Sequence, residues 1–209
     1  MSKGKSLWEM DEIRIATGAM VILGSATALL VVVPYMLLEK IRPPEKLIPY
    51  TATQLVGRQS YIANGCVYCH SQQPRDTKQA PDFLRGWGRA PVAADYAFDT
   101  PHLLGTMRTG PDLLNIGARQ PSSDWHLGHL YQPRAYTPGS TMPSYPYLFN
   151  VHKGQAMPDE TVVNLPSKWK NEGEVVIAKP EALALVDYLK SLNRTYPVLP
   201  AAEAAQEKP

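Results

Sequence analysis

The five-residue motif Cys66-Val67-Tyr68-Cys69-His70 constrains the fold of this chain more than any other feature. Two cysteines separated by two residues and followed at once by histidine form the attachment pattern of c-type haem. Each thiol adds across one vinyl group of the porphyrin, and the adjacent imidazole is then held beneath the iron, which needs a strong proximal ligand. The motif therefore predicts one covalently bound haem c on Cys66 and Cys69, with His70 as the proximal ligand.

Two other uses of a cysteine pair compete with haem attachment. A zinc site needs further ligands, and Cys66 and Cys69 are the only cysteines in the chain. A thioredoxin-like site needs a strand before the pair, whereas residues 57–63 are predicted as helix. Both alternatives are therefore less favoured than haem.

The composition limits the fold and the partners. With 20 prolines and 14 glycines in 209 residues, the chain should be rich in turns and loops and poor in sheet. A net charge of +2 is too small to indicate nucleic-acid binding. We therefore expect a mainly α protein with no nucleic-acid partner.

Residues 15–38 form a run of 24 residues without a charged side chain. As a helix this run would be about 36 Å long, enough to cross a hydrocarbon core of about 30 Å, so it predicts a transmembrane anchor in contact with membrane lipid. The alternative is a cleaved signal peptide, whose apolar region is normally about 7 to 15 residues long. The length of the run and the charged residues that follow it favour the uncleaved anchor.

The orientation follows from the haem, because the lysines and arginines on the two sides of the apolar run are balanced. Maturation of c-type haem takes place outside the bacterial cytoplasm. We therefore predict a single-pass protein of the bacterial inner membrane with its haem domain in the periplasm. The expected segments are a cytoplasmic N-terminus (1–14), the anchor (15–38), a proline-rich spacer (39–50), a mono-haem cytochrome c domain (51–196) and a disordered tail (197–209).

Two helices should frame the haem domain. The first is expected from an N-cap at Thr53 to about residue 64, with an apolar face that includes Leu55, Val56 and Ile62. Gly57 and Tyr61 lie one turn apart on this helix and offer a surface for a second helix that begins near Pro180. The second helix carries an apolar stripe formed by Leu183, Leu185, Val186, Leu189 and Leu192. This pairing resembles the class I cytochrome c fold, here with long loop insertions.

Two segments lie between these helices. Residues 71–100 are predicted as a long loop held by Trp87, Tyr96 and Phe98. A short helix should begin at the capping group Ser122-Ser123-Asp124 and end before Pro133.

An electron-transfer haem needs a sixth ligand, and methionine is a common one. Met142 and Met157 each precede a proline, which would hold the sulfur rigidly, and spacing favours Met142. Met107 is less favoured because Arg108 and Thr109 lead into a different motif. Each methionine has the alternative of ordinary core packing. The remaining possible ligands are histidines, for which a structural role is the simpler interpretation: His102, His126, His129 and His152.

The segment from Arg108 to Leu113 is similar to the loop of small cytochromes in which a proline carbonyl accepts the ring N–H of the proximal histidine. Here the acceptor would be the carbonyl of Pro111, which would fix the ring of His70 and strengthen its donation to iron. Arg108 and Arg119 are candidate partners for a haem propionate, with an ordinary solvated arginine as the alternative for each.

Taken together and in order, these motifs resemble the mono-haem subunit II of the cbb(3)-type, C-family haem–copper cytochrome c oxidases over residues 15–193. The most specific part is residues 125–146, which contains Trp125-His126, the run from His129 to Arg134, and Met142-Pro143-Ser144-Tyr145-Pro146. The resemblance implies a His/Met haem with Met142 as the distal ligand. It departs from the family at Gln73-Pro74, where a methionine and an isoleucine are usual, and in the longer, more polar segment 148–179.

The resemblance implies an electron-transfer subunit rather than a catalytic one. Electrons would come from another cytochrome c subunit or a soluble cytochrome c, and would pass to the haem–copper membrane subunit that reduces oxygen. The nearest alternative is the cytochrome subunit of a nitric oxide reductase. A haem peroxidase and a gas sensor are further alternatives, and a peroxidase would need an open sixth position on the iron.

Overall fold

The computed structural model of the chain describes residues 12–38, 41–75, 81–105 and 108–197. The chain divides into two compact units, residues 1–42 and 43–209, which are described separately. Met107, residues 1–11 of the expected N-terminus and residues 198–209 of the expected tail lie outside the described residues.

The first unit contains one long apolar helix. It runs from Glu12 to Leu38, through α1 (Glu12–Thr27), a π-helical turn η2 (Ala28–Val32) and α2 (Val33–Leu38). The wide turn comes just before Pro34, whose nitrogen has no hydrogen to donate to the preceding turn. The helix has 27 residues and a mean hydropathy of 2.3 in its most apolar stretch, so it is long and apolar enough to cross a membrane.

The first helix of the second unit, α3 (Ala52–Ala63), has its N-cap two residues before the expected one. Its N-cap is Thr51, whose side chain accepts from the N–H of Gln54 at 3.2 Å. The side chain of Gln54 in turn accepts from the N–H of Thr51 at 3.0 Å. This reciprocal capping box satisfies two backbone donors, which a cap at Thr53 would not do, so the expected N-cap at Thr53 is wrong.

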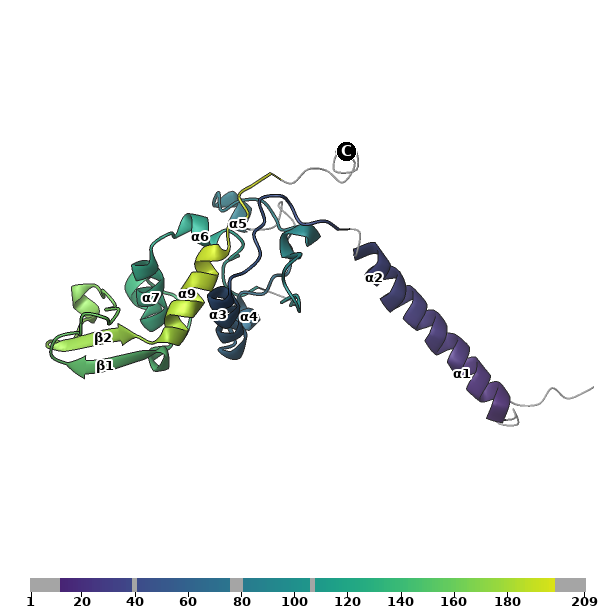
Figure 1. Cartoon of the computed structure of the whole chain (residues 1–209), viewed down its shortest axis with the longest axis horizontal. Coiled ribbons are helices and arrows are strands. Elements are labelled where there is room, and N and C mark those ends of the chain that lie inside the picture. Colours follow the sequence, from purple (N-terminus) through teal and green to yellow (C-terminus); the bar gives the residue numbers. More distant parts are fainter. Residues whose placement is uncertain (1–11, 39–40, 76–80, 106–107, 198–209) are drawn as a thin grey trace, which may run out of the picture. The chain divides into compact units, whose positions relative to one another are not determined.

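Helix α3 packs against the last helix, α9 (Pro180–Ser191), as the sequence predicted, and the two lie side by side in Figure 1. Gly57 makes the approach close, since a Cβ atom there would lie 1.9 Å from the carbonyl oxygen of Ala184. Next to it the rings of Tyr61 and Tyr188 meet edge to face, with centroids 5.6 Å apart. The two helices form the centre of the hydrophobic core.

The apolar face expected on α3 is not the buried one. Leu55 and Val56 are 47% and 52% exposed, whereas Gly57, Ser60 and Tyr61 are the residues that face the core. On α9, Leu183 is likewise 39% exposed, although the rest of its expected stripe is buried. The reason is that these helices approach through small residues, and this close contact turns the larger aliphatic side chains of α3 outward.

Two short helices, α6 (Ile116–Arg119) and α7 (Ser123–Tyr131), also pack against α9, and α8 (Pro133–Tyr136) packs against α7. The hydroxyl of Ser122 caps α7 by accepting from the N–H of Trp125, as the sequence predicted. In α6, a Cβ atom on Gly117 would lie 2.0 Å from the carbonyl oxygen of Lys190, so the backbones of α6 and α9 are in direct contact.

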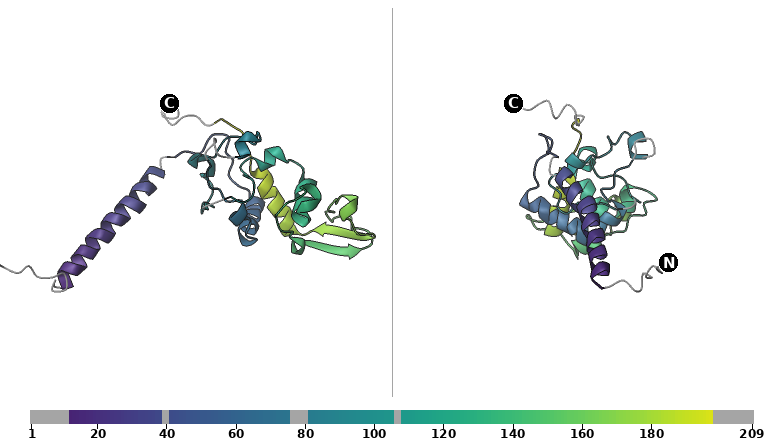
Figure 2. Two further views of the ribbon diagram at one scale, coloured as in Figure 1. Left: turned by 180° about the vertical axis from the view of Figure 1, so that it is seen from behind. Right: turned by 90° about the vertical axis from the view of Figure 1, so that its right-hand side faces the viewer.

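A two-stranded antiparallel hairpin completes the domain and was not predicted. Strand β1 (Phe149–Lys153) pairs with β2 (Glu174–Ala178), with Phe149 opposite Ala178 and Lys153 opposite Glu174. The hairpin extends beyond α7 and α9 (Figure 2). The short 3₁₀ helices η4 (Pro146–Leu148) and η5 (Ser167–Trp169) lie before β1 and between the strands. The fold is therefore mainly α, as expected, with one apolar N-terminal helix followed by a helical domain.

The predicted long loop contains α5 (Pro81–Leu84) and the 3₁₀ helix η3 (Ala93–Tyr96). Tyr96 is buried, as expected, and ion pairs also hold this segment. Arg89 pairs with the buried Asp95 at 2.6 Å, and Arg58 of α3 pairs with the buried Asp99 at 3.0 Å. The ion pairs and hydrogen bonds of these carboxylates offset the desolvation penalty of burying them.

Candidate haem site

The cysteine motif forms a single helical turn, α4 (Cys66–Cys69), entered through Gly65 with a φ of 71°. That left-handed conformation favours glycine, because other side chains rarely adopt it. Residues three apart in a helical turn lie on one side, which brings both thiols to the same surface. Cys66 is buried, Cys69 is exposed, and both are free within the described residues. Burial raises the pKa of the Cys66 thiol to about 11.

The ring of His70 is fixed through one nitrogen. Its Nδ1 lies 2.8 Å from the carbonyl oxygen of Pro111, the contact expected from the sequence. Burial lowers the pKa of His70, which keeps the imidazole neutral. Because the carbonyl can only accept, Nδ1 carries the hydrogen and Nε2 has a free lone pair. A neutral histidine held in this way is a suitable iron ligand.

Gly110 makes room for this ring. Its N–H donates to the carbonyl of Cys69 at 2.8 Å, and a Cβ atom on it would lie 2.3 Å from Cε1 of His70. The residues present therefore fit a covalently attached haem. Two free thiols lie on one surface, and next to them is a neutral imidazole whose orientation is fixed by its surroundings.

Arg108 lies in this site but is already paired. Its guanidinium forms an ion pair with Asp112, lies 4.0 Å from Asp82, and donates to the carbonyl of Gln73. The side chain is completely buried. With two carboxylates beside it, Arg108 has little uncompensated charge left for a haem propionate.

Arg119, at the end of α6, has an unsatisfied donor. Its guanidinium lies over the ring of Trp87, 4.1 Å from the centroid, and donates to the carbonyl of Asp112 at 2.8 Å. Its Nε is buried and has no hydrogen-bond partner among the described residues, which is also true of Nε and Nη1 of Arg108. Burial lowers the pKa of Arg119, so an added anion would relieve the cost of this buried cation. Unsatisfied donors do not separate the two arginines, but Arg108 already has Asp112 and Asp82 beside it, so the charge balance favours Arg119 as the partner of a haem carboxylate.

The two candidate methionines differ in their surroundings. Met142 is partly buried and packs against the hydrophobic core, whereas Met157 is 61% exposed. Three residues after Met142, the hydroxyl of Tyr145 forms a hydrogen bond with the thiol of Cys66. The loop that carries Met142 therefore lies against the cysteine motif, and this favours Met142 as the sixth ligand.

The candidate histidines have structural partners. His126 and His102 each place Nε2 near a backbone carbonyl, at 2.8 Å from Gln120 and 3.2 Å from Tyr96. His152 lies 3.9 Å from Glu160. His129 stacks on Trp125 with 4.5 Å between ring centroids, and burial lowers the pKa of His129 to about 4.

Several residues beside His70 were missed from the sequence. The hydroxyl of Tyr61 donates to the carbonyl of His70, which ties α3 to the motif. Arg75 donates to the carbonyl of Arg108 at 2.6 Å, and Asp82 accepts from the N–H of Asp112 at 3.3 Å. Arg75 could have been considered from the sequence, because it lies only five residues beyond His70. Nothing in the sequence indicates that residue 82 contacts residue 112.

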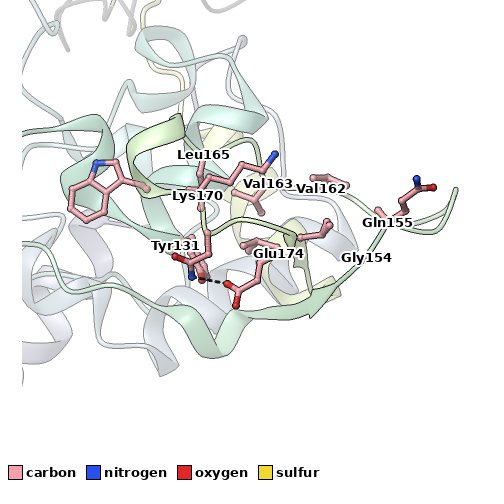
Figure 3. A pocket seen from close by; sticks show the side chains of 13 residues that line it. Tyr131, Gly154, Gln155, Val162, Val163, Leu165, Lys170 and Glu174 are labelled. Atoms are coloured by element: carbon pink, nitrogen blue, oxygen red, sulfur yellow. Dashed lines mark hydrogen bonds between the residues drawn. The ribbon is translucent and has the colours of Figure 1, made fainter.

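A separate cavity of about 280 Å³ lies between the hairpin and the segment that joins its strands (Figure 3). Asn171 donates to Glu174 at its edge, at 2.6 Å. None of the predicted site residues lines it. The lining is mostly apolar and includes Tyr131, Ala156, Val162, Val163, Leu165, Trp169, Val175 and Val176.

The fold and the site define a small haem-binding domain that follows one apolar N-terminal helix. The chain belongs to the FixO family: residues 5–167 match the family described as cytochrome c oxidase, mono-heme subunit/FixO. No curated protein matches the chain. Membership makes this chain a haem-binding subunit of a cbb(3)-type cytochrome c oxidase, associated with the catalytic subunit, and the long apolar helix fits a membrane-anchored protein.

Proposed function

We propose that this subunit relays single electrons through one covalently bound haem c to the haem–copper subunit that reduces oxygen. The observation that carries the proposal is the hydrogen bond between His70 Nδ1 and the Pro111 carbonyl. It leaves Nε2 free as a ligand, beside two free thiols on the same helical turn. The family match supports the oxidase as the destination of the electrons.

In this proposal the chain holds the haem from both sides. Cys66 and Cys69 form the thioether bonds, His70 Nε2 is the proximal ligand and Met142 the distal one. When bound, the haem iron supplies a centre that accepts and donates one electron. The residues keep that centre in one geometry: Pro111 fixes the ring of His70, and Pro143 stiffens the backbone after Met142.

Arg119 has a separate role in the proposal, which is to neutralise a haem carboxylate. Its buried, unpartnered Nε and its lowered pKa support this assignment. Stacking on Trp87 holds the guanidinium in place, so little side-chain entropy is lost when the anion binds. Such a pair would also bury the charged edge of the porphyrin.

The proposed setting is the inner membrane of a bacterium, with residues from about 39 onward in the periplasm. The apolar helix of residues 12–38 supports the anchor, and a c-type haem would require the domain to mature outside the cytoplasm. A second cytochrome c subunit or a soluble cytochrome c is the proposed electron donor.

The test is to express the full chain in a bacterium that matures c-type cytochromes, with C66A, C69A and the double variant beside it. After denaturing electrophoresis the parent chain should keep its haem stain, and the double variant should lose it. The purified oxidase containing the parent subunit should then oxidise a reduced cytochrome c and consume oxygen. A parent chain without retained haem, or an oxidase that turns over equally well without this subunit, would reject the proposal.

The same preparation tests the alternatives. A subunit of a nitric oxide reductase would support reduction of nitric oxide rather than oxygen. A peroxidase or gas sensor would have an open iron position, and its reduced haem would bind carbon monoxide. The partly buried position of Met142 favours a six-coordinate iron that does not bind carbon monoxide.

A further inference from the structure

We propose that Asp82, held by Arg75, is a positioning residue for His70, because it fixes the peptide plane whose carbonyl accepts the His70 Nδ1–H. This inference rests on the proposed function, in which His70 binds the haem iron. It assigns a role to the α5 insertion, which carries Asp82 and contains none of the predicted haem ligands.

The argument begins with one peptide unit. The carbonyl of Pro111 and the N–H of Asp112 belong to the same planar group, so fixing one end fixes the direction of the other. At one end the Pro111 oxygen lies 2.8 Å from His70 Nδ1. At the other end the Asp112 N–H donates to Asp82 Oδ1 at 3.3 Å. Asp82 therefore holds the N–H end of this peptide group, which is the end that points away from His70.

Arg75 holds Asp82 and the backbone just before this plane. Its Nη1 lies 3.6 Å from Asp82 Oδ2, and its Nη2 donates to the carbonyl of Arg108 at 2.6 Å. The same Nη2 lies 3.4 Å from the carbonyl oxygen of Gly110, in the peptide unit that precedes Pro111. One planar guanidinium thus spans a carboxylate and two carbonyls, a geometry that a lysine ammonium cannot reproduce.

A second set of contacts joins the segment of residues 69–75 to the segment of residues 108–112. Gly110 donates to the carbonyl of Cys69 at 2.8 Å, and Arg108 donates to the carbonyl of Gln73. Each arginine therefore reaches from its own segment to the backbone of the other. The ring of Pro111 fixes its φ angle, so only rotation about its ψ angle remains between Gly110 and the acceptor carbonyl.

The charges of this group balance. Arg75 and Arg108 face Asp82 and Asp112, and the four side chains are between 0% and 24% exposed. A carboxylate that accepts from one end of a peptide group polarises the carbonyl at the other end, which makes it a stronger acceptor. Asp82 should therefore strengthen the hydrogen bond from His70, increase electron donation by its Nε2 and stabilise the oxidised iron.

The test uses the full chain with bound haem and ¹⁵N-labelled histidine in the reduced, diamagnetic state. Solvent exchange of the His70 Nδ1–H is measured by NMR in the parent, D82A and R75Q, with R75K as a variant that keeps the charge. Exchange should be about tenfold faster in D82A and R75Q, as expected for weakening one hydrogen bond. R75K should lie between the parent and R75Q. An exchange rate equal to that of the parent in R75Q and R75K would overturn the inference, even if D82A failed to fold.

The midpoint potential separates positioning from simple charge. R75K keeps the charge of Arg75 but cannot reproduce the contacts of its planar guanidinium. A weaker His70 hydrogen bond raises the potential, whereas a charge effect alone leaves it unchanged in this variant. The potential of R75K should therefore lie above that of the parent, and a potential equal to or below that of the parent would count against the role of Arg75.

Haem staining of every variant keeps this inference distinct from the proposed function. Parent and variants with retained haem but unchanged Nδ1–H exchange would reject the role of Asp82 and Arg75 alone. A parent chain without covalent haem would instead reject the proposed function on which the inference rests.

Discussion

His70 and Gly110 are in such close contact that a single added carbon would not fit between them. A Cβ atom on Gly110 would lie 2.3 Å from Cε1 and 2.7 Å from Nδ1 of the imidazole. Glycine is therefore required here by a side chain from a segment 40 positions earlier rather than by backbone conformation. The contact links the cysteine motif to the loop that carries the Pro111 carbonyl.

The first prediction follows from this contact. G110A should push the ring of His70 away from the Pro111 carbonyl, because the loop is also held by backbone hydrogen bonds and cannot retreat freely. Mature haem-containing protein should fall several-fold, measured by haem staining against total protein. G24A is the control, because nothing lies within 4 Å of its Cβ position. Normal haem content in G110A would show that the loop relaxes.

The second prediction concerns the sixth ligand. M142A should abolish the weak near-infrared charge-transfer band of ferric His/Met haem and allow the reduced protein to bind carbon monoxide. M157A should keep the band, since Met157 is 61% exposed and Met142 packs against the core. Each of the two variants loses one methionine side chain, so M157A also controls for the loss of a thioether as such. Loss of the band in M157A alone would overturn the assignment.

The third prediction concerns Arg119. R119Q should lower the midpoint potential, because an unpaired carboxylate stabilises the oxidised iron. At an effective dielectric of about 20 the loss of a charge at roughly 15 Å is worth about 1 kcal/mol, or about 40 mV for one electron. R85Q is the control, since Arg85 also lies over Trp87 but is exposed. Equal shifts in the two variants would argue against a carboxylate partner for Arg119.

Local patterns were sufficient to predict the helix pairing. Gly57 and Tyr61 are one turn apart, and a small residue beside an aromatic ring indicates a helix contact whatever the tertiary structure. The same periodicity wrongly predicted that Leu55 and Val56 face the core, because these side chains are 47% and 52% exposed. Burial depends on which face of a helix packs against another element. Here the face with the smaller side chains allowed the two helices to approach more closely.

The hairpin and the Asp82 contact could not be predicted in the same way. Strands β1 and β2 are separated by residues 154–173, so no short turn sequence marks the pairing. Asp82 reaches Asp112 across 30 positions, through an insertion without a regular pattern. Such long-range contacts depend on how loops fold onto the core, and a single sequence carries little information about them.

The fourth prediction tests the helix contact. G57A places a methyl group 1.9 Å from the carbonyl oxygen of Ala184, and neither backbone can move without disturbing the core. The free energy of unfolding should fall by about 1–3 kcal/mol or more, measured by urea unfolding of the haem-containing protein followed by tryptophan fluorescence. V56A, on the exposed side of the same helix, should change it by less than about 0.5 kcal/mol. A G57A protein as stable as V56A would show that α3 and α9 are less closely packed.

The fifth prediction is a pH dependence that arises from His129. Burial, with smaller contributions from His126 and His70, lowers the pKa of His129 to about 4. Between about pH 6.5 and pH 4 the unfolded chain binds a proton at this residue and the folded chain does not, so stability falls as the pH falls through this range. The loss should reach about 3 kcal/mol at most, from about 1.4 kcal/mol per unit of pKa difference.

The variant H129F tests this sign, because phenylalanine keeps an aromatic ring on Trp125 and cannot bind a proton. Urea unfolding of the parent between pH 4 and pH 7 should show decreasing stability toward acid, and H129F should show a smaller slope. Some slope should remain, since burial also lowers the pKa of His126. A parent whose stability is constant over this range, or a variant with the same slope as the parent, would mean that His129 is accessible to protons in the folded protein.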